Sequence, residues 1–266
     1  MKRTSKKSWN LQKKLAVAMS LVNALNTTAP VALPYVNITK DLSAQGGKVQ
    51  SIAQGHNSLF YGTAQAAGPT DSTTVAPGST ETRDTVSDGG KQVVEGGQAE
   101  GSAGGTGIIT NMEGGTQIVN GGINSGSGGT GIITSMNSGW QDISGGSGII
   151  TSMSDGEQLV GSGTGTVFIM DNGGQYVNSG GNGTITTMNG GTQSINKDGI
   201  GTVETMASGG IQDISNHGVG TVTSLGGTQV VHKGGTSRDT HDKGGLLELR
   251  SGAVLQNSGG TAMAYN

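Results

Sequence analysis

The chain has 266 residues, of which 52 are glycine and none is cysteine; aromatic residues make up 3% and the formal net charge is −3. So much glycine and so few aromatic side chains exclude an ordinary globular core, and the lack of cysteine excludes disulfide frameworks and thiolate metal sites. Ile and Val recur at fixed offsets between the glycines, which lack the every-third-residue spacing of collagen. The glycines are therefore interpreted as corner residues of an ordered fold.

Residues 1–29 have the pattern of a secretory signal peptide, so the chain is expected to be exported. Six Lys and Arg flank or precede an apolar segment at residues 15–25, which is shorter than the roughly 20 residues that a transmembrane helix requires. A basic amphipathic surface helix is the alternative, but the segment has no polar face. Subtracting those 6 from the 15 Lys and Arg leaves 9 against 18 Asp and Glu. Such an acidic mature chain argues against nucleic acid as a partner.

Residues 30–85 follow no repeat. Turn-forming residues dominate 68–80, which reads as a linker, and the short apolar segments 47–50 and 59–61 are expected to be edge strands. An open solenoid end needs a cover, so residues 30–85 are predicted to be an N-terminal cap and linker.

Two short motifs alternate from residue 86 to residue 266. The first, Gly-[Thr/Ile]-[Val/Ile]-x-x-Met, begins at Gly107, Gly131, Gly148, Gly165, Gly183 and Gly201, and at Gly220 with Leu225 in place of Met. The second, Gly-x-Gln-x-[Val/Ile], places glutamines 17–25 residues apart: Gln92, Gln117, Gln141, Gln158, Gln175, Gln193, Gln212 and Gln229. Fixed-period repeats of this kind predict an all-β parallel β-solenoid over residues 86–266, with two short strands and glycine-rich corners in each coil.

Alternation along each strand predicts which side chains face inward. The residue after each Gln varies freely, as expected of a solvent face, so Gln and the following β-branched residue should both point inward. Stacked about 4.8 Å apart, the glutamines should form an amide ladder. In the first strand, Val or Ile and then a small residue such as Ser135 or Thr187 are expected on one inner face. Met comes one residue out of phase, which predicts a bend.

No catalytic, metal or cofactor site is predicted. The four histidines lack metal-ligand spacing, and no serine lies in a hydrolase elbow. Three Gly-Gly-x-Gly segments begin like the calcium-binding nonapeptide, but its Asp position is occupied by isoleucine: Ile109, Ile133 and Ile185. Asp142 and Asp213 are too far apart to act on one sugar bond, whereas Asp155 and Glu157 lie together near a corner. Trp140 and Tyr176 point outward and are candidates for a contact face.

The repeats, placed behind a signal peptide, resemble the passenger repeats of AIDA-type autotransporter adhesins, the self-associating autotransporters of Gram-negative bacteria. This resemblance covers residues 86–266 and implies a right-handed parallel β-helix at the cell surface. Some members of the family are O-glycosylated before export by a dedicated transferase, which makes turn serines candidate acceptors: Ser125, Ser138, Ser154, Ser179 and Ser208. Members of the family also carry a membrane β-barrel that is not found in this sequence, so a truncated passenger is expected.

The resemblance implies an exported outer-membrane, cell-surface or secreted adhesin that mediates adhesion, autoaggregation and biofilm formation. Its expected partner is a host receptor or an identical passenger. Two alternatives remain open at this point. A secreted β-helix enzyme acting on polysaccharides would use Asp155 and Glu157, and a purely structural surface or matrix protein would need no site at all.

Overall fold

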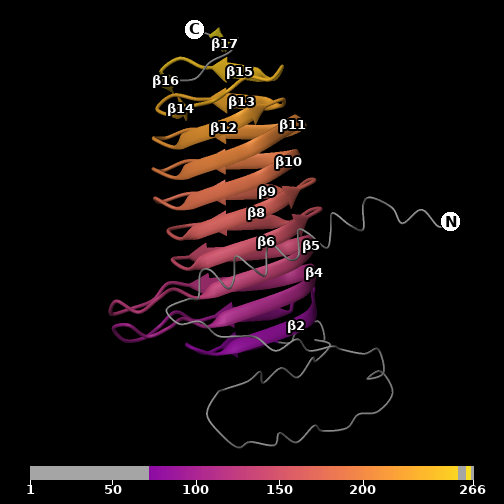
Figure 1. Cartoon of the computed structure of the whole chain (residues 1–266), viewed down its shortest axis with the longest axis vertical. Helices are drawn as coiled ribbons and strands as arrows, with labels where there is room; N and C mark the ends of the chain where they lie inside the picture. The colour runs from indigo at the N-terminus through magenta and orange to yellow at the C-terminus, as the bar shows by residue number, and fades with distance from the viewer. Residues whose placement is uncertain (1–71, 257–261, 265–266) are drawn as a thin grey trace, which may run out of the picture. The chain divides into compact units, whose positions relative to one another are not determined.

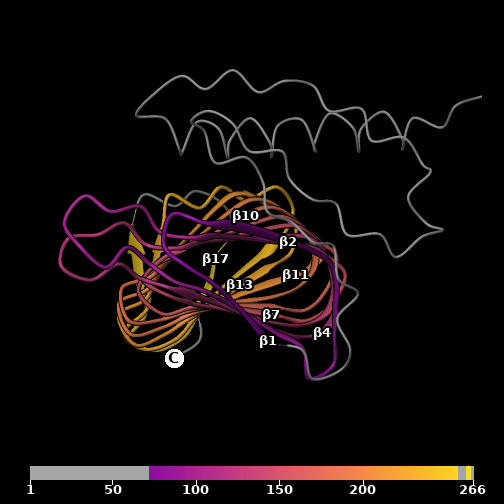
Figure 2. The same cartoon turned by 90° about the horizontal axis from the view of Figure 1, so that it is seen from below.

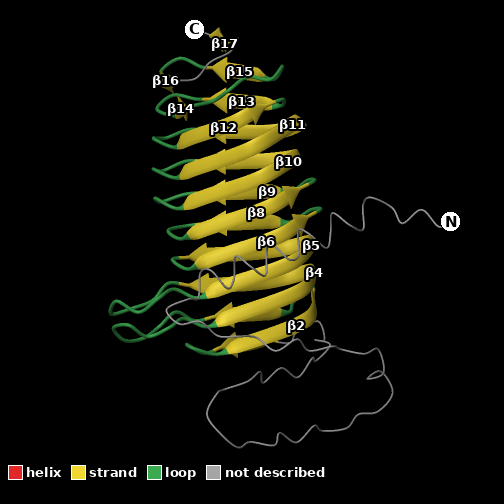
Figure 3. Ribbon diagram, viewed as in Figure 1, coloured by secondary structure: helices red, strands yellow, loops and turns green. Residues whose placement is uncertain are grey.

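Residues 72–256 and 262–264 are described by the computed structural model, and they contain strands and loops but no helix (Figure 3). They lie in the second of two compact units, Phe60–Asn266. The expected signal peptide at 1–29 and the expected cap strands at 47–50 and 59–61 lie outside the described residues. The strands are β1 (Ser72–Val75), β2 (Thr80–Ser87), β3 (Lys91–Val94), β4 (Thr106–Asn120), β5 (Thr130–Ser144), β6 (Ser147–Met153), β7 (Glu157–Val160), β8 (Thr164–Met170), β9 (Gly174–Val177), β10 (Asn182–Ile195), β11 (Ile200–Ile214), β12 (Val219–Leu225), β13 (Thr228–Val231), β14 (Thr236–Arg238), β15 (Leu246–Leu249), β16 (Val254–Gln256) and β17 (Ala262–Ala264).

These strands form parallel ladders, each with the equivalent strand of the next coil. Figure 1 shows them stacked one above another from β2 to β17. The long strands β4, β5, β10 and β11 turn a corner and supply both strands of a coil, while β8 and β9 divide that role. The result is a parallel β-solenoid of about ten turns, each of about 18 residues, which confirms the predicted fold class.

The first strand of each coil, which carries the Met motif, and the second strand, which carries Gln, enclose a narrow interior. Ile or Val from both strands and Met from the first fill it. In the coil formed by β8 and β9, Val167, Met170 and Val177 are all fully buried. The same three positions are buried in the neighbouring coils, so the interior consists of apolar columns that run along the stack.

The inward Met and the bend before it are present, but the small residue beside Met is not part of the inner face. The parallel register joins Ile109 to Ile133 and Asn111 to Ser135 and skips the residue between. Two partly exposed residues, rather than one, separate buried Ile109 from buried Met112. The prediction that Ser135 and Thr187 share the inner face with Ile or Val was therefore wrong, because the bend comes one residue earlier than expected.

The eight repeat glutamines form a continuous hydrogen-bonded ladder through the interior. All are fully buried. Apart from Gln92, whose Nε2 is buried with no hydrogen-bond partner among the described residues, each glutamine donates from Nε2 to Oε1 of the glutamine one coil earlier, at 2.7 Å from Gln117 to Gln92 and 2.6 Å from Gln175 to Gln158. Six of them also approach the carbonyl of the first-strand glycine in their own coil, such as Gly165 for Gln175 at 3.3 Å. The ladder thus satisfies amide groups that would otherwise be costly to bury.

The first-strand glycine is required because the glutamine of the preceding coil fills the space beside it. A Cβ atom on Gly165 would lie 2.6 Å from Oε1 of Gln158 and 2.4 Å from Cγ2 of Val160. A Cβ atom would lie at the same short distance from Oε1 of the preceding coil's glutamine at four other first-strand glycines: Gly131, Gly148, Gly183 and Gly220. Gly, Gln and the β-branched residue therefore form one interlocking unit that repeats along the stack.

Both ends of the solenoid depart from the repeat. At the N-terminal end the parallel ladder already includes Ser72, the first described residue, so coils are present before the predicted boundary at residue 86. There Arg83 and Val86 occupy the buried positions that Ile or Val and Met hold elsewhere.

At the C-terminal end Ser237 replaces the first-strand glycine. Its Oγ donates to Oε1 of Gln229 at 2.8 Å, which terminates the amide ladder.

Candidate functional site

The outer surface of the solenoid is variable where the interior is constant. The position between Gln and the β-branched residue points outward and differs from coil to coil: Val93, Ile118, Asp142, Leu159, Tyr176, Ser194, Asp213 and Val230. Two kinds of corner separate the outer faces. The first corner joins the two strands of one coil, as at residues 137–139, and the second corner leads to the next coil, as at 144–146. Two long second corners, 95–105 and 121–129, project beyond the others (Figure 2).

The five candidate acceptor serines lie on both corners rather than on one face. Ser138, Ser154 and Ser208 are at first corners, and Ser125 and Ser179 are at second corners. Ser138 is half-buried and the other four are exposed. Ser125 and Ser179 also have left-handed backbone conformations, with φ of 63° and 52°. The exposed hydroxyls are sterically open to modification, but they form no single cluster.

Trp140 and Tyr176 belong to different outward positions of the second strand, yet the structure brings their rings into one column. Trp140 precedes its Gln, and the register places Glu157 and then Gly174 directly above it in the next two coils. Tyr176 follows its Gln, but its ring leans along β9 over Gly174, where a Cβ atom would lie 2.7 Å from Cε2 of the tyrosine. The tyrosine ring therefore lies in the column that contains Trp140, two coils or about 10 Å along the stack from that residue.

Below Trp140 the same column continues into a shallow groove. The groove lies over the first corners of three successive coils, at residues 88–90, 114–115 and 138–139. Thr116 and Lys91 lie one and two coils below the tryptophan. Glycine backbone forms the floor, and Asp88 and Ser138 complete the lining. The floor cannot carry side chains: a Cβ atom on Gly139 would lie 2.6 Å from the carbonyl oxygen of Gly114. Close stacking of the corners thus keeps the groove open.

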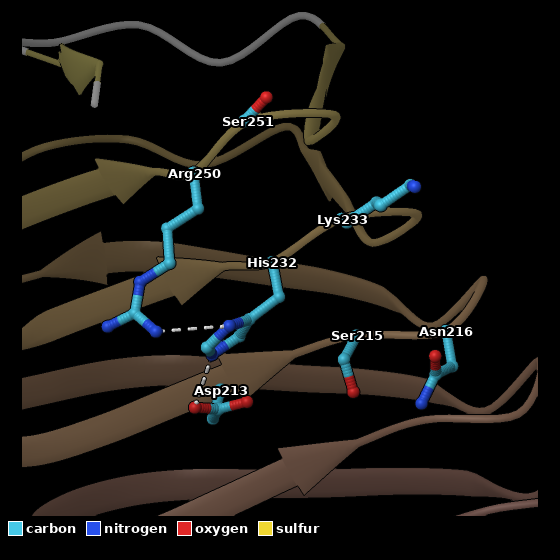
Figure 4. Close-up of a pocket in the computed structure, with 7 residues that line it drawn as sticks. All are labelled: Asp213, Ser215, Asn216, His232, Lys233, Arg250 and Ser251. Carbon is cyan, nitrogen blue, oxygen red and sulfur yellow. Dashed lines mark hydrogen bonds and ion pairs between the residues drawn. The ribbon is translucent and has the colours of Figure 1, made fainter. Parts of the chain in front are cut away.

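A second depression lies near the C-terminal end, at the second corners, and is centred on His232 (Figure 4). Nε2 of His232 lies 2.9 Å from Oδ2 of Asp213, and Nδ1 lies 3.2 Å from Nη1 of Arg250. Arg250 also donates from Nε to Oε1 of Glu248 at 2.8 Å. Because Arg250 can only donate, Nδ1 is the acceptor of that contact and Nε2 faces the carboxylate, so both ring nitrogens are engaged. The carboxylates, the imidazole and the guanidinium at this depression therefore contact one another.

The acidic residues considered for a polysaccharide-active site lie at different positions on the outer surface. Asp142 and Asp213 occupy the same outward column four coils apart, about 19 Å. Asp155 is exposed at a first corner, where its Oδ1 accepts a hydrogen bond from the backbone nitrogen of Gly156 at 2.8 Å. Glu157 instead lies in the outward column between Trp140 and Gly174. Within the described ranges, no group of three or more His, Asp or Glu residues is placed to hold a metal ion.

Sequence reasoning missed the alignment of Trp140 with Tyr176 and the contribution of Asp88 and Lys91. Part of this column could have been found by aligning the residue before each Gln, which is Lys91, Thr116, Trp140, Glu157 and Gly174 in successive coils. That alignment does not show that the Tyr176 ring lies over Gly174. No helix in the described part of the chain has the length and apolar character needed to cross a membrane.

Comparison with known proteins gives one weak structural likeness. No family model and no curated protein matches the sequence. The chain is similar to the crystal structure of a TibC-catalysed hyper-glycosylated TibA fragment, with 24% sequence identity and a TM-score of 0.41, over 77% of this chain and 94% of that chain. A TM-score this low supports no statement about this chain. The solenoid assignment rests on the parallel register and the amide ladder.

Proposed function

We propose that this chain is an exported, cell-surface adhesin whose solenoid acts by contact and not by catalysis. The proposal is supported by the division between a constant interior and a variable exterior over about ten coils. Constant interior positions preserve the stack, while the outer positions are free to carry the side chains that a partner meets. Repetition along one axis also allows several weak contacts to act together.

The partner is a host surface or a second copy of the chain, with adhesion, autoaggregation and biofilm formation as the cellular outcome. This part of the proposal comes from the resemblance of the repeats to AIDA-type passengers. The secretion pattern of residues 1–29 supports export. The exposed outer faces fit either partner, because neither requires an enclosed pocket.

The test is display of the chain on the surface of a non-adherent bacterium, followed by measurement of settling rate and of retention on host cells. We expect faster settling or greater retention than with cells that display a variant with Gln158→Glu and Gln175→Glu. That variant has the same length and differs at only two residues, both of which are buried. Equal behaviour of the two strains at equal display would contradict the proposal. Polysaccharide cleavage that disappears on Asp155→Asn and Glu157→Gln substitution would replace it with an enzymatic role.

Glycosylation of the corner serines is a second part of the proposal, supported by the exposure of Ser125, Ser154, Ser179 and Ser208. Protein recovered from its native cells should have an intact mass above that of the polypeptide. Peptide mapping should place the added sugar on these exposed hydroxyls more often than on half-buried Ser138. A native protein with no excess mass would exclude the modification.

A further inference from the structure

An aromatic and polar strip runs along the outer face of the second strands. We define it as Asp88, Lys91, Thr116, Trp140, Glu157 and Tyr176. Trp140 is 53% exposed, which is unusual for the largest apolar side chain in a chain that has so few aromatic residues. An indole and a phenol kept at the surface in one column point to a ligand that offers flat apolar faces together with hydroxyl groups.

The polar side chains of the strip are not engaged with the protein. Within residues 72–256, no side-chain hydrogen bond or ion pair is formed by Asp88, Lys91, Trp140, Glu157 or Tyr176. The depression at His232 differs, because there the carboxylates, the imidazole and the guanidinium already bind one another. The strip thus offers two carboxylates, an ammonium, an indole N–H and a phenol to an external partner.

The spacing along the strip requires an extended ligand. Trp140 and the ring of Tyr176 are two coils apart, about 10 Å, with Glu157 between them. Lys91 lies two coils on the other side of Trp140, so the strip spans about 20 Å in all. A single sugar ring cannot reach both aromatic side chains, whereas a linear chain of sugars laid parallel to the solenoid axis can.

The charge around the strip selects against an acidic ligand. Residues 72–171 contain ten Asp and Glu, and their only cations are Arg83 and Lys91, of which Arg83 is buried. A sulfated or uronic-acid polymer laid on this surface would meet repulsion at Asp88, Glu113 and Glu157. An uncharged polymer would meet none, and its hydroxyl groups can donate to those same carboxylates.

We propose that this strip binds a linear, uncharged polysaccharide, with one sugar ring stacked on Trp140 and another on Tyr176. The glycine-floored groove beyond Trp140 holds the next part of the polymer, where Asp88 and Lys91 bind its hydroxyl groups. This inference rests on the proposed contact function and specifies the chemical class of its ligand.

The test uses the purified full chain carrying Trp9→Phe, so that Trp140 is the sole tryptophan. Uncharged β-1,4-linked glucan, mannan and N-acetylglucosamine oligosaccharides of two to six units are titrated, and heparin serves as the acidic comparison. At least one uncharged series should bind saturably by calorimetry and shift the tryptophan emission to shorter wavelength. Affinity should rise about tenfold or more between the disaccharide and the hexasaccharide, because only the longer ligand spans both rings.

Trp140→Ala and Tyr176→Ala should each weaken hexasaccharide binding about tenfold or more. Ile211→Ala is the matched control: Ile211 is an exposed apolar residue in the same column, 41% exposed and beyond the strip, and its removal should leave affinity unchanged. Unaltered circular dichroism of all three variants would show that the coils are intact. The proposal is overturned if no uncharged oligosaccharide binds, if heparin binds in their place, or if binding survives loss of both aromatic side chains.

The two proposals fail separately. Cell adhesion that persists in the Trp140→Ala variant, together with no binding of purified protein to oligosaccharides, would remove the polysaccharide ligand and leave the adhesin. Oligosaccharide binding by purified protein with no gain in adhesion by displaying cells would keep the strip as a saccharide site and remove the adhesin.

Discussion

At the scale of single residues, each first-strand glycine is constrained by the glutamine that faces it. Gly165 has no room for a methyl group, because the added carbon would lie 2.6 Å from Oε1 of Gln158 and 2.4 Å from Cγ2 of Val160. We predict that Gly165→Ala lowers the free energy of unfolding by about 1–3 kcal/mol, the range found for overpacked cores. Urea denaturation followed by circular dichroism measures this.

Gly161→Ala is the control for that experiment. Gly161 lies at a second corner, and a Cβ atom there would approach only the carbonyl oxygen of Ile143, at 3.3 Å. Its free energy of unfolding should stay close to that of the parent chain. Equal losses in the two variants would mean that crowding against the glutamine ladder does not decide the stability of the first-strand glycine.

The buried amides also make the interior sensitive to charge. We predict that Gln158→Glu with Gln175→Glu destabilises the solenoid near neutral pH, because two carboxylates one coil apart would be fully buried. Burial and mutual repulsion would raise the pKa of both groups above the unfolded value of about 4.3. The folded chain would then hold these two protons more tightly than the unfolded chain does. The free energy of unfolding should therefore fall as pH rises above about 4.3.

Thermal melting at pH 4 and pH 7 tests this sign. Ser194→Glu is the matched control, because it places a carboxylate one coil from Asp213 on the outer face, where water screens the pair. It should show little difference in melting temperature between the two pH values beyond that of the parent chain. A double variant that melts at a higher temperature at pH 7 than at pH 4 would contradict a buried ladder.

At the scale of the strand, the methionine after the bend fixes how each first strand meets its corner. Met153 is fully buried at the end of β6 and stacks between Met136 and Met170. We predict that Met153→Ala costs about 2–5 kcal/mol, as for other large-to-small changes in cores. Ile211→Ala, which removes an exposed side chain from a strand of the same sheet, should cost much less in the same denaturation assay. Comparable losses would indicate that Met153 is not part of a packed column.

The same element shows what the sequence could and could not predict. Gln158 and Val160 were correctly assigned to the interior, because the residue between them varies from coil to coil as a solvent face does and alternation places its two neighbours on the other face. The prediction that Ser135 and Thr187 face inward was wrong. Side chains alternate between two faces only within a straight strand, and both residues lie beyond the bend, where they are half-exposed. β1 and β2 were missed because their coil has Arg83 in place of the usual isoleucine or valine.

The candidate strip was only partly predictable for a related reason. Trp140 and Tyr176 were expected on the outside, but alternation alone places them in different columns. Their alignment depends on the tyrosine ring lying over Gly174, and the direction in which a side chain leans along a strand is set by space beside it. A glycine two residues before an outward aromatic side chain is the pattern that would have revealed it.

At the scale of the whole molecule, each coil contacts only its neighbours, so stability should be a sum over coils and their interfaces. We predict that deletion of residues 165–182, one complete coil, leaves a folded solenoid, because Gln158 then meets Gln193 and the register of the ladder is preserved. Deletion of residues 165–173, half a coil, would place the second strand β9 where a first strand belongs. Circular dichroism and melting should show strand signal and a cooperative transition for the first deletion only. Loss of cooperative melting in both would mean that the coils are not interchangeable units.

The amide ladder also gives the solenoid a polarity. From Gln229 back to Gln92, the N–H of each side chain points to the oxygen of the preceding coil. If one amide reversed, nitrogen would face nitrogen on one side and oxygen would face oxygen on the other, so the amides can change orientation only all together. Their dipoles add along the axis, with the N–H end at Gln92 and the oxygen end at Gln229. The hydroxyl of Ser237 donates to that last oxygen. Glycine carbonyl oxygens, which can only accept, lie beside Nε2 in successive coils and favour this direction for the whole row.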